Sequence, residues 1–266
     1  MEINHFIGYI LAVFVGITLG LIGSGGSILS VPILAYVMGI EPVLATAYSL
    51  FVVGTTALIG GIKKAQQQLV DFRKVFLFGI PTVVAVFLTR KFIVPNLPEV
   101  IAVTSSFSVK KSVLIMTVFA IVMIAASYRM IRPVKEKERT SNKLNYPAII
   151  AQGVFIGLVA GFVGAGGGFL IIPALVFLAK TPMKIAVGTS LFIVSLQSLI
   201  GFLGDIRVDQ ILDWKLIGIF TVCSIIGVFI GGYLSKKING ENLKTGFGWF
   251  VLVMGIYIIV KELFVS

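Results

Sequence analysis

Long apolar runs separated by short polar segments make up almost the whole chain. Their lengths are close to the roughly 20 residues that a helix needs to cross a bilayer, whereas the strands of a membrane barrel would alternate apolar and polar residues over about 10. We therefore expect an all-α polytopic membrane protein. The runs predict helices at residues 6–22, 26–39, 42–62, 72–94, 112–131, 147–164, 168–179, 183–204, 215–235 and 246–264.

Two of the predicted helices, 26–39 and 168–179, are too short to cross a membrane. The longer one covers about 21 Å at about 1.5 Å per residue, against roughly 30 Å of hydrocarbon core. Each follows a glycine-rich stretch at the end of a longer helix, so each pair predicts a helical hairpin with its apex inside the membrane. The pattern at residues 95–111 is semi-polar and fits either a span or an interfacial segment.

The glycine-rich stretch occurs twice. Residues 20–32 read GLIGSGGSILSVP and residues 161–173 read GFVGAGGGFLIIP, with the shared glycines, leucine and proline at one constant offset. Such an internal duplication predicts two homologous transmembrane repeats, residues 1–131 and 147–266. The charged stretch 132–146 would join them as a cytoplasmic linker.

Each predicted repeat contains an odd number of segments, so the second repeat is expected to enter the membrane from the opposite side. With the linker in the cytoplasm, the loops at 63–74, 129–143, 180–184 and 236–244 lie on that side and hold most of the 22 basic residues. Arg90, Lys91, Lys110 and Lys111 oppose this bias. The balance favours an inverted repeat with both termini outside and with the two glycine-broken hairpins meeting near the bilayer midplane.

Glycines let the backbone leave helical geometry and approach a ligand closely, and a helix N-terminus presents unpaired N–H groups and a partial positive charge. Two such ends at the membrane centre predict an anion site that needs no cationic side chain. Within the two glycine runs, hydroxyls would come from the first repeat only, because Ala165 and Gly168 stand where the first run has Ser24 and Ser27. The expected substrate-binding residues are Gly23, Ser24, Gly25, Gly26, Ser27, Ser49, Gly164, Ala165, Gly166, Gly167, Gly168 and Ser190.

Some of these residue types also have purely structural explanations. Gly16 with Gly20, and Gly157 with Gly161, have the GxxxG spacing of tight helix crossings and are expected to serve packing. The consecutive glycines of the two turns exceed what packing needs, so we favour ligand binding for them.

The prolines and serines of the motif regions also leave alternatives open. Pro32 and Pro173 are expected to break their helices, either as bends or by freeing a carbonyl. Ser49 and Ser190 occupy equivalent positions, in AYSLFVV and GTSLFIV. Serine in a membrane helix often bonds back to its own backbone, and that role is favoured for any single serine. As a duplicated pair opposite the glycine turns, Ser49 and Ser190 are balanced between that role and substrate contact. Thr56 and Gln197 are further polar residues of the helices that carry Ser49 and Ser190.

Composition narrows the function classes. A chain that is 58% hydrophobic and 12% charged leaves too little polar surface for a soluble globule. The net charge of +11 comes from basic residues that flank apolar spans, so the expected partner is membrane lipid and not nucleic acid. One cysteine, one histidine and no carboxylate in mid-span predict no metal site, no cofactor and no catalytic residue.

The paired glycine stretches with their following Leu and Pro, the two-half layout and the charged central linker together resemble the TauE/SafE sulfite exporter family, also called the TSUP transporters. The resemblance covers nearly the whole chain, and the family motif maps onto residues 23–32 and 164–173. It implies transport, often outward, of sulfite, organosulfonates or related small anions, with a proton or sodium gradient as the driving force.

The leading hypothesis is a secondary transporter of the cell membrane that exports its substrate. It would work by alternating access around an anion site near the bilayer midplane. A passive anion channel, or a transporter of another small organic anion, is the alternative. An intramembrane serine enzyme built on Ser24 is disfavoured, because the only histidine, His5, lies about 28 Å away along one helix.

Overall fold

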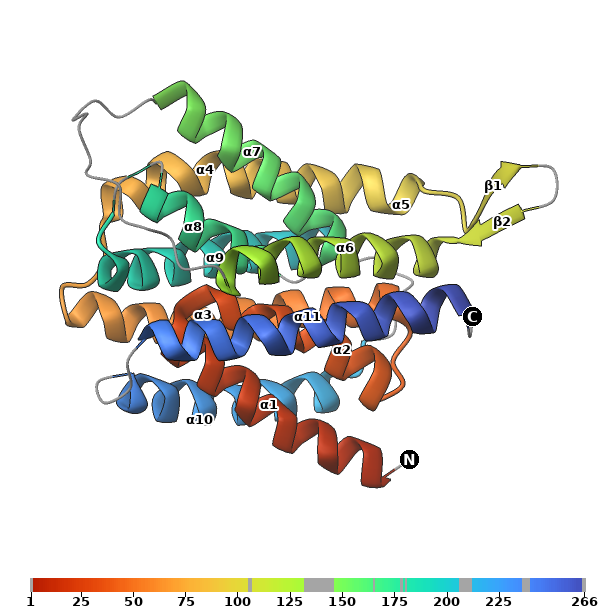
Figure 1. Ribbon diagram of the computed structural model, residues 1–266, viewed down its shortest axis with the longest axis horizontal. Coiled ribbons are helices and arrows are strands. Elements are labelled where there is room, and N and C mark those ends of the chain that lie inside the picture. The colour runs from red at the N-terminus through yellow and green to blue at the C-terminus, as the bar shows by residue number, and fades with distance from the viewer. Residues whose placement is uncertain are drawn as a thin grey trace.

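The computed structural model describes residues 2–104, 107–131, 146–164, 166–177, 179, 181–205, 212–235 and 240–264. The predicted linker lies outside these residues, apart from Tyr146. The chain forms an elongated bundle of helices that run roughly along its long axis, with both termini at one end (Figure 1).

The predicted all-α class is confirmed. The longer helices are α1 (Glu2–Ile22), α3 (Pro42–Gln66), α4 (Phe72–Leu88), α6 (Lys111–Ile131), α7 (Tyr146–Val163), α8 (Gly168–Phe177), α9 (Met183–Asp205), α10 (Trp214–Leu234) and α11 (Gly240–Phe264). The short helical segments are the 3₁₀ helix η1 (Gly23–Leu29), α2 (Ser30–Pro32), the π-helices η2 (Ile33–Val37) and η3 (Thr89–Ile93), and α5 (Val94–Asn96). Within the described residues, six helices are long and apolar enough to cross a membrane.

The semi-polar stretch contains an element that the sequence pattern did not reveal. Strands β1 (Val100–Thr104) and β2 (Phe107–Lys110) pair antiparallel, with Val100 opposite Lys110. β-Branched residues favour strands, and β1 reads VIAVT. The hairpin projects from the end of the bundle that carries the termini (Figure 1).

The helices pack in pairs that each take one member from either predicted repeat. Helix α1 packs on α10, α7 on α4, α3 on α9 and α6 on α11. Two hydrogen bonds are reciprocal: the Asp213 N–H donates to the Tyr48 hydroxyl over 2.8 Å, and the Asp71 N–H donates to Thr189 Oγ1 over 3.0 Å. Reciprocal contacts of this kind are what a two-fold relation between the repeats would produce.

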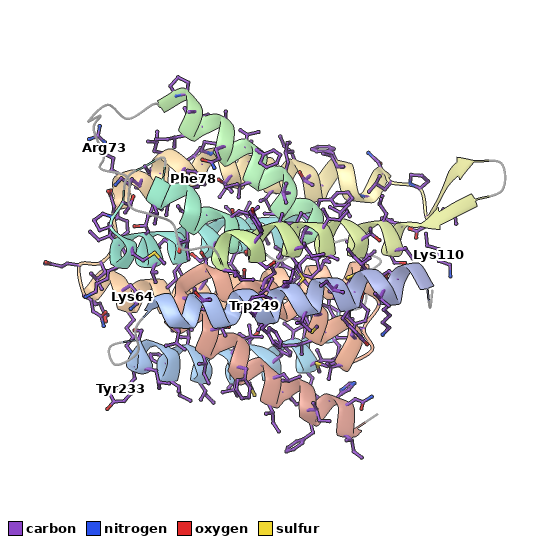
Figure 2. All side chains as sticks on the ribbon, in the orientation of Figure 1. Lys64, Arg73, Phe78, Lys110, Tyr233 and Trp249 are labelled. Atoms are coloured by element: carbon purple, nitrogen blue, oxygen red, sulfur yellow. The ribbon has the colours of Figure 1, made fainter. Side chains whose placement is uncertain are left out.

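Figure 1 also shows the directions of equivalent helices. Helix α1 starts at the end that carries both termini, whereas α7 starts at the opposite end; α6 starts where its counterpart α11 finishes. Figure 2 shows Lys64, Arg73 and Tyr233 at the end opposite to the termini. An inverted repeat requires opposite directions of this kind, and the inverted repeat itself stays a prediction.

The GxxxG glycines lie at helix crossings, which confirms their predicted packing role. A Cβ at Gly16 would lie 2.8 Å from the backbone N of Val228 in α10, and a Cβ at its counterpart Gly157 would lie 2.5 Å from the carbonyl oxygen of Thr82 in α4. Any side chain at these two positions would separate the paired helices.

Replacing Gly16 with alanine is expected to lower the free energy of unfolding by about 1–3 kcal/mol, the usual cost of extra atoms in a packed interface. Gly218→Ala is the matched control, because an added Cβ there meets no described atom within 4 Å and alanine favours a helix by about 1 kcal/mol. Denaturation in detergent micelles measures both variants. Equal stability would contradict the packing role of Gly16.

Candidate functional site

The first glycine turn ends α1. Gly23 has φ of +76°, a backbone conformation that side chains disfavour, so the helix stops at Ile22 and η1 follows in a new direction. The turn is seated on α9 of the other predicted repeat, where a Cβ at Gly23 would lie 2.9 Å from Cγ1 of Val187. The helix break expected at this glycine run is therefore present.

The second glycine turn also breaks its helix at a glycine with positive φ, but it contains three such glycines where the first turn contains one. Gly164 has φ of +75°, Gly166 +67° and Gly167 +56°, so α7 ends just before the turn and α8 begins just after it. A Cβ at Gly164 would collide with Thr46 of α3, which is the counterpart of Val187 in the first repeat. Ala165, which the sequence analysis assigned to the site, lies outside the described residues.

The two turns contact each other directly. The Ser24 hydroxyl donates to the carbonyl oxygen of Gly168 over 2.9 Å, and Ser24 is fully buried. A Cβ at Gly168 would collide with Ser24 and lie 2.7 Å from its carbonyl carbon. The structure thus brings together the two glycine runs that the sequence analysis selected.

The other predicted serines are buried and bonded within the protein. The Ser27 hydroxyl donates to the Ser24 carbonyl over 2.9 Å. Ser49 shares a 2.6 Å hydrogen bond with Ser30, which follows the first turn, whereas Ser190 bonds back to Val187 in its own helix over 2.9 Å. Only Ser24 and Ser49 therefore link separate segments.

Two glycines of the runs close their own hairpins. A Cβ at Gly26 would lie 2.5 Å from the backbone N of Leu19 in α1, and a Cβ at the equivalent Gly167 would lie 2.5 Å from Cβ of Ala160 in α7. Close packing accounts for these two glycines. Gly25 directly precedes Gly26 within η1.

The helical backbone continues past both predicted helix breakers. Pro32 is the last residue of α2 and leads directly into the π-helix η2, and Pro173 lies inside α8. The breaks therefore lie at the glycines and not at the prolines. The first short segment ends at Val37, just before Gly39, which has φ of +71°.

An arginine that the sequence analysis counted only in the charge balance, and did not assign to the site, lies beside the second turn. The side chain of Arg90, in η3, is 0% exposed. Its Nη1 donates to Oδ2 of Asp205 over 2.8 Å and to Oγ1 of Thr46 over 3.0 Å. A Cβ at Gly164 would collide with its Nη2. The position of Arg90 inside the predicted span 72–94 was the available signal, because ionisable groups in spans are costly and usually functional.

Further buried polar groups of α3 and α9 have no hydrogen-bond partner among the described residues. They are Ser198 Oγ, both side-chain polar atoms of Gln197, and Thr56 Oγ1, all fully buried. A Cβ at Gly166 would lie 2.7 Å from Ser198 Oγ. The second turn is thus bordered by Arg90 at Gly164 and by Ser198 at Gly166. In the described part of the chain, no three His, Cys, Asp or Glu side chains gather as a metal site.

Comparison with known proteins places this arrangement in a family. Residues 9–262 match the family described as Sulfite exporter TauE/SafE. A "Probable membrane transporter protein" of Xylella fastidiosa strain 9a5c is 30% identical over 256 residues, covering 93% of this chain and 92% of the relative. The "Probable membrane transporter protein YunE" of Bacillus subtilis is 26% identical over 273 residues, covering 94% and 93%.

No solved structure matches the chain. The family match nevertheless spans nearly the whole sequence, and the long apolar helices give the chain the means to cross a membrane several times. The chain therefore belongs to the TauE/SafE sulfite exporter family and is a multi-pass membrane transporter of the cell membrane.

Proposed function

We propose that the protein is a secondary transporter that exports sulfite or a related small sulfur-containing anion such as an organosulfonate. The observation that carries the proposal is the direct contact of the two glycine turns through the 2.9 Å hydrogen bond between Ser24 and Gly168. Two helix breaks that meet inside a bundle expose backbone groups to a ligand where intact helices would not. The family name supports sulfite as the first substrate to test.

The transport cycle we propose has residues 1–131 and 147–266 as inverted repeats that move relative to one another around this site. The reciprocal helix pairs and the opposite directions of α6 and α11 support the arrangement. Each turn is seated on the other repeat, Gly23 on Val187 and Gly164 on Thr46. Movement between the repeats would therefore change the surroundings of both turns together.

Flux through proteoliposomes tests the proposal. Purified protein is reconstituted, and uptake of sulfite, thiosulfate, methanesulfonate and chloride is followed with and without proton or sodium gradients. A transporter gives saturable flux that accumulates one sulfur anion against its gradient when the coupling ion is supplied. Flux that only follows the anion's own gradient would identify a channel, and flux no greater than in empty liposomes would refute the proposal.

Ser24→Ala is expected to slow sulfite transport about five- to tenfold, because the link between the turns is worth about 1 kcal/mol. The matched control is Ser127→Ala: Ser127 is also fully buried and donates to a carbonyl, that of Ile124 over 2.7 Å, but it lies in α6. Initial rates in proteoliposomes compare the two variants. Equal rates would remove Ser24 from the site.

A further inference from the structure

We propose that Arg90 is the cationic side chain of the anion site and binds two oxygens of the substrate through the Nε and Nη2 edge of its guanidinium. This inference rests on the proposed function and narrows the substrate to an oxyanion with at least two oxygens on one centre, such as a sulfite or a sulfonate. A halide would not fit this edge as well, since it offers a single acceptor.

Both hydrogen bonds that the guanidinium makes to described residues come from Nη1. Arginine has five N–H donors in one plane. Nη1 uses its donors on Asp205 and Thr46, whereas Nε and Nη2 make no hydrogen bond to any described residue. Nε and Nη2 share the edge that binds two oxygens side by side, which is the strongest pairing available to arginine.

Burial makes the unpaired edge informative. A charged donor that is buried without a partner is costly, and native proteins rarely keep one without a reason. Arg90 is 0% exposed, so solvent at the protein surface does not reach this edge. A ligand that enters the bundle would supply the missing acceptors.

The edge faces the turn that the proposed function places in the site. Nη2 lies where any side chain at Gly164 would collide with it, so the glycine leaves that nitrogen uncovered. The Ser198 hydroxyl, which is also buried and has no partner among the described residues, borders the same turn at Gly166. Asp205 holds the opposite edge and neutralises the charge while no anion is bound.

Binding to the purified protein tests the inference with Arg90→Lys. Lysine keeps the positive charge but lacks the planar pair of donors, so the affinity for sulfite and methanesulfonate is expected to fall about 10- to 100-fold while chloride is unaffected. Lys91→Gln is the matched control, because Lys91 is the exposed neighbouring cation, above the rings of Phe87 and Phe92. Its sulfite affinity should equal that of the wild type.

A second variant covers the case in which Arg90→Lys does not fold. Arg90→Gln combined with Asp205→Asn replaces the ion pair with two amides, and it should lose the thermal stabilisation by sulfite. If neither variant folds, anion selectivity of the wild type decides: stabilisation by sulfite and methanesulfonate but not by chloride supports the inference, and equal stabilisation by chloride overturns it.

The outcomes separate this inference from the proposed function. Wild-type affinity for sulfite in a folded variant would overturn the role of Arg90 and leave sulfite transport standing. Failure of the wild type to bind or transport any sulfur oxyanion would overturn both.

Discussion

Gly164→Ala is expected to abolish transport and to lower the free energy of unfolding by about 2–4 kcal/mol. Two costs add at this position. The φ of +75° disfavours any side chain, and the new methyl group would collide with Thr46 and with Nη2 of Arg90. Relief of that collision would move the arginine edge away from the turn, so transport should fail even where the protein still folds.

Gly39→Ala separates the two costs. Gly39 has nearly the same φ, +71°, but an added Cβ there meets no described atom within 4 Å. The Gly39→Ala variant should lose only the conformational part of the free energy of unfolding, about 1 kcal/mol, and should retain transport. Denaturation in detergent and sulfite flux in proteoliposomes measure both variants. If Gly164→Ala transports as well as Gly39→Ala, the second turn does not form part of the site.

The two backbone breaks could be predicted because their cause is local. A residue with φ near +75° between two helical segments is almost always glycine, and the duplication pointed to Gly23 and Gly164 together. The expected meeting of the two glycine runs is confirmed by the hydrogen bond between Ser24 and Gly168. The prolines were expected to break their helices, but the helical backbone continues past both, from Pro32 into η2 and through Pro173 within α8.

The burial of Arg90, in place of Lys91, could not be predicted in this way, because the partners of Arg90 are distant in the chain. In the sequence, Arg90 and Lys91 are adjacent cations near the end of an apolar run, and both counted as charges that flank a span. The structure buries Arg90 against Asp205 and exposes Lys91. Which of two adjacent cations turns inward depends on the helices packed around them, here α9 and the start of α3.

Sequence equivalence also overstated the symmetry of the serines. Ser49 and Ser190 align, yet Ser49 bonds to Ser30 and Ser190 bonds to its own helix. The reason is that the counterpart of Ser30 is Ile171, which offers no hydroxyl. One substitution outside the glycine run thus gives the two repeats different hydrogen bonds.

Asp205→Asn is expected to lower the free energy of unfolding by about 3–5 kcal/mol, the usual cost of leaving a buried charge without its counter-charge. Arg90 has no exposed surface through which water could compensate. Glu99→Gln is the control, because Glu99 also pairs with a cation, Lys111 at 3.6 Å, but is 87% exposed. The change in the free energy of unfolding of this variant should be close to zero. Similar losses in the two variants would contradict the structural importance of the buried pair.

Sulfite should then distinguish a structural arginine from a ligand-binding one in the same variant. In Asp205→Asn the buried charge of Arg90 lacks its carboxylate, and a bound oxyanion on the Nε and Nη2 edge would supply the missing negative charge. The rise in unfolding temperature with sulfite should therefore be larger in Asp205→Asn than in the wild type, because at a given concentration a ligand stabilises the folded state more when it binds that state more tightly. An equal or smaller rise would mean that sulfite does not reach Arg90, and that the arginine serves only to tie η3 to α9.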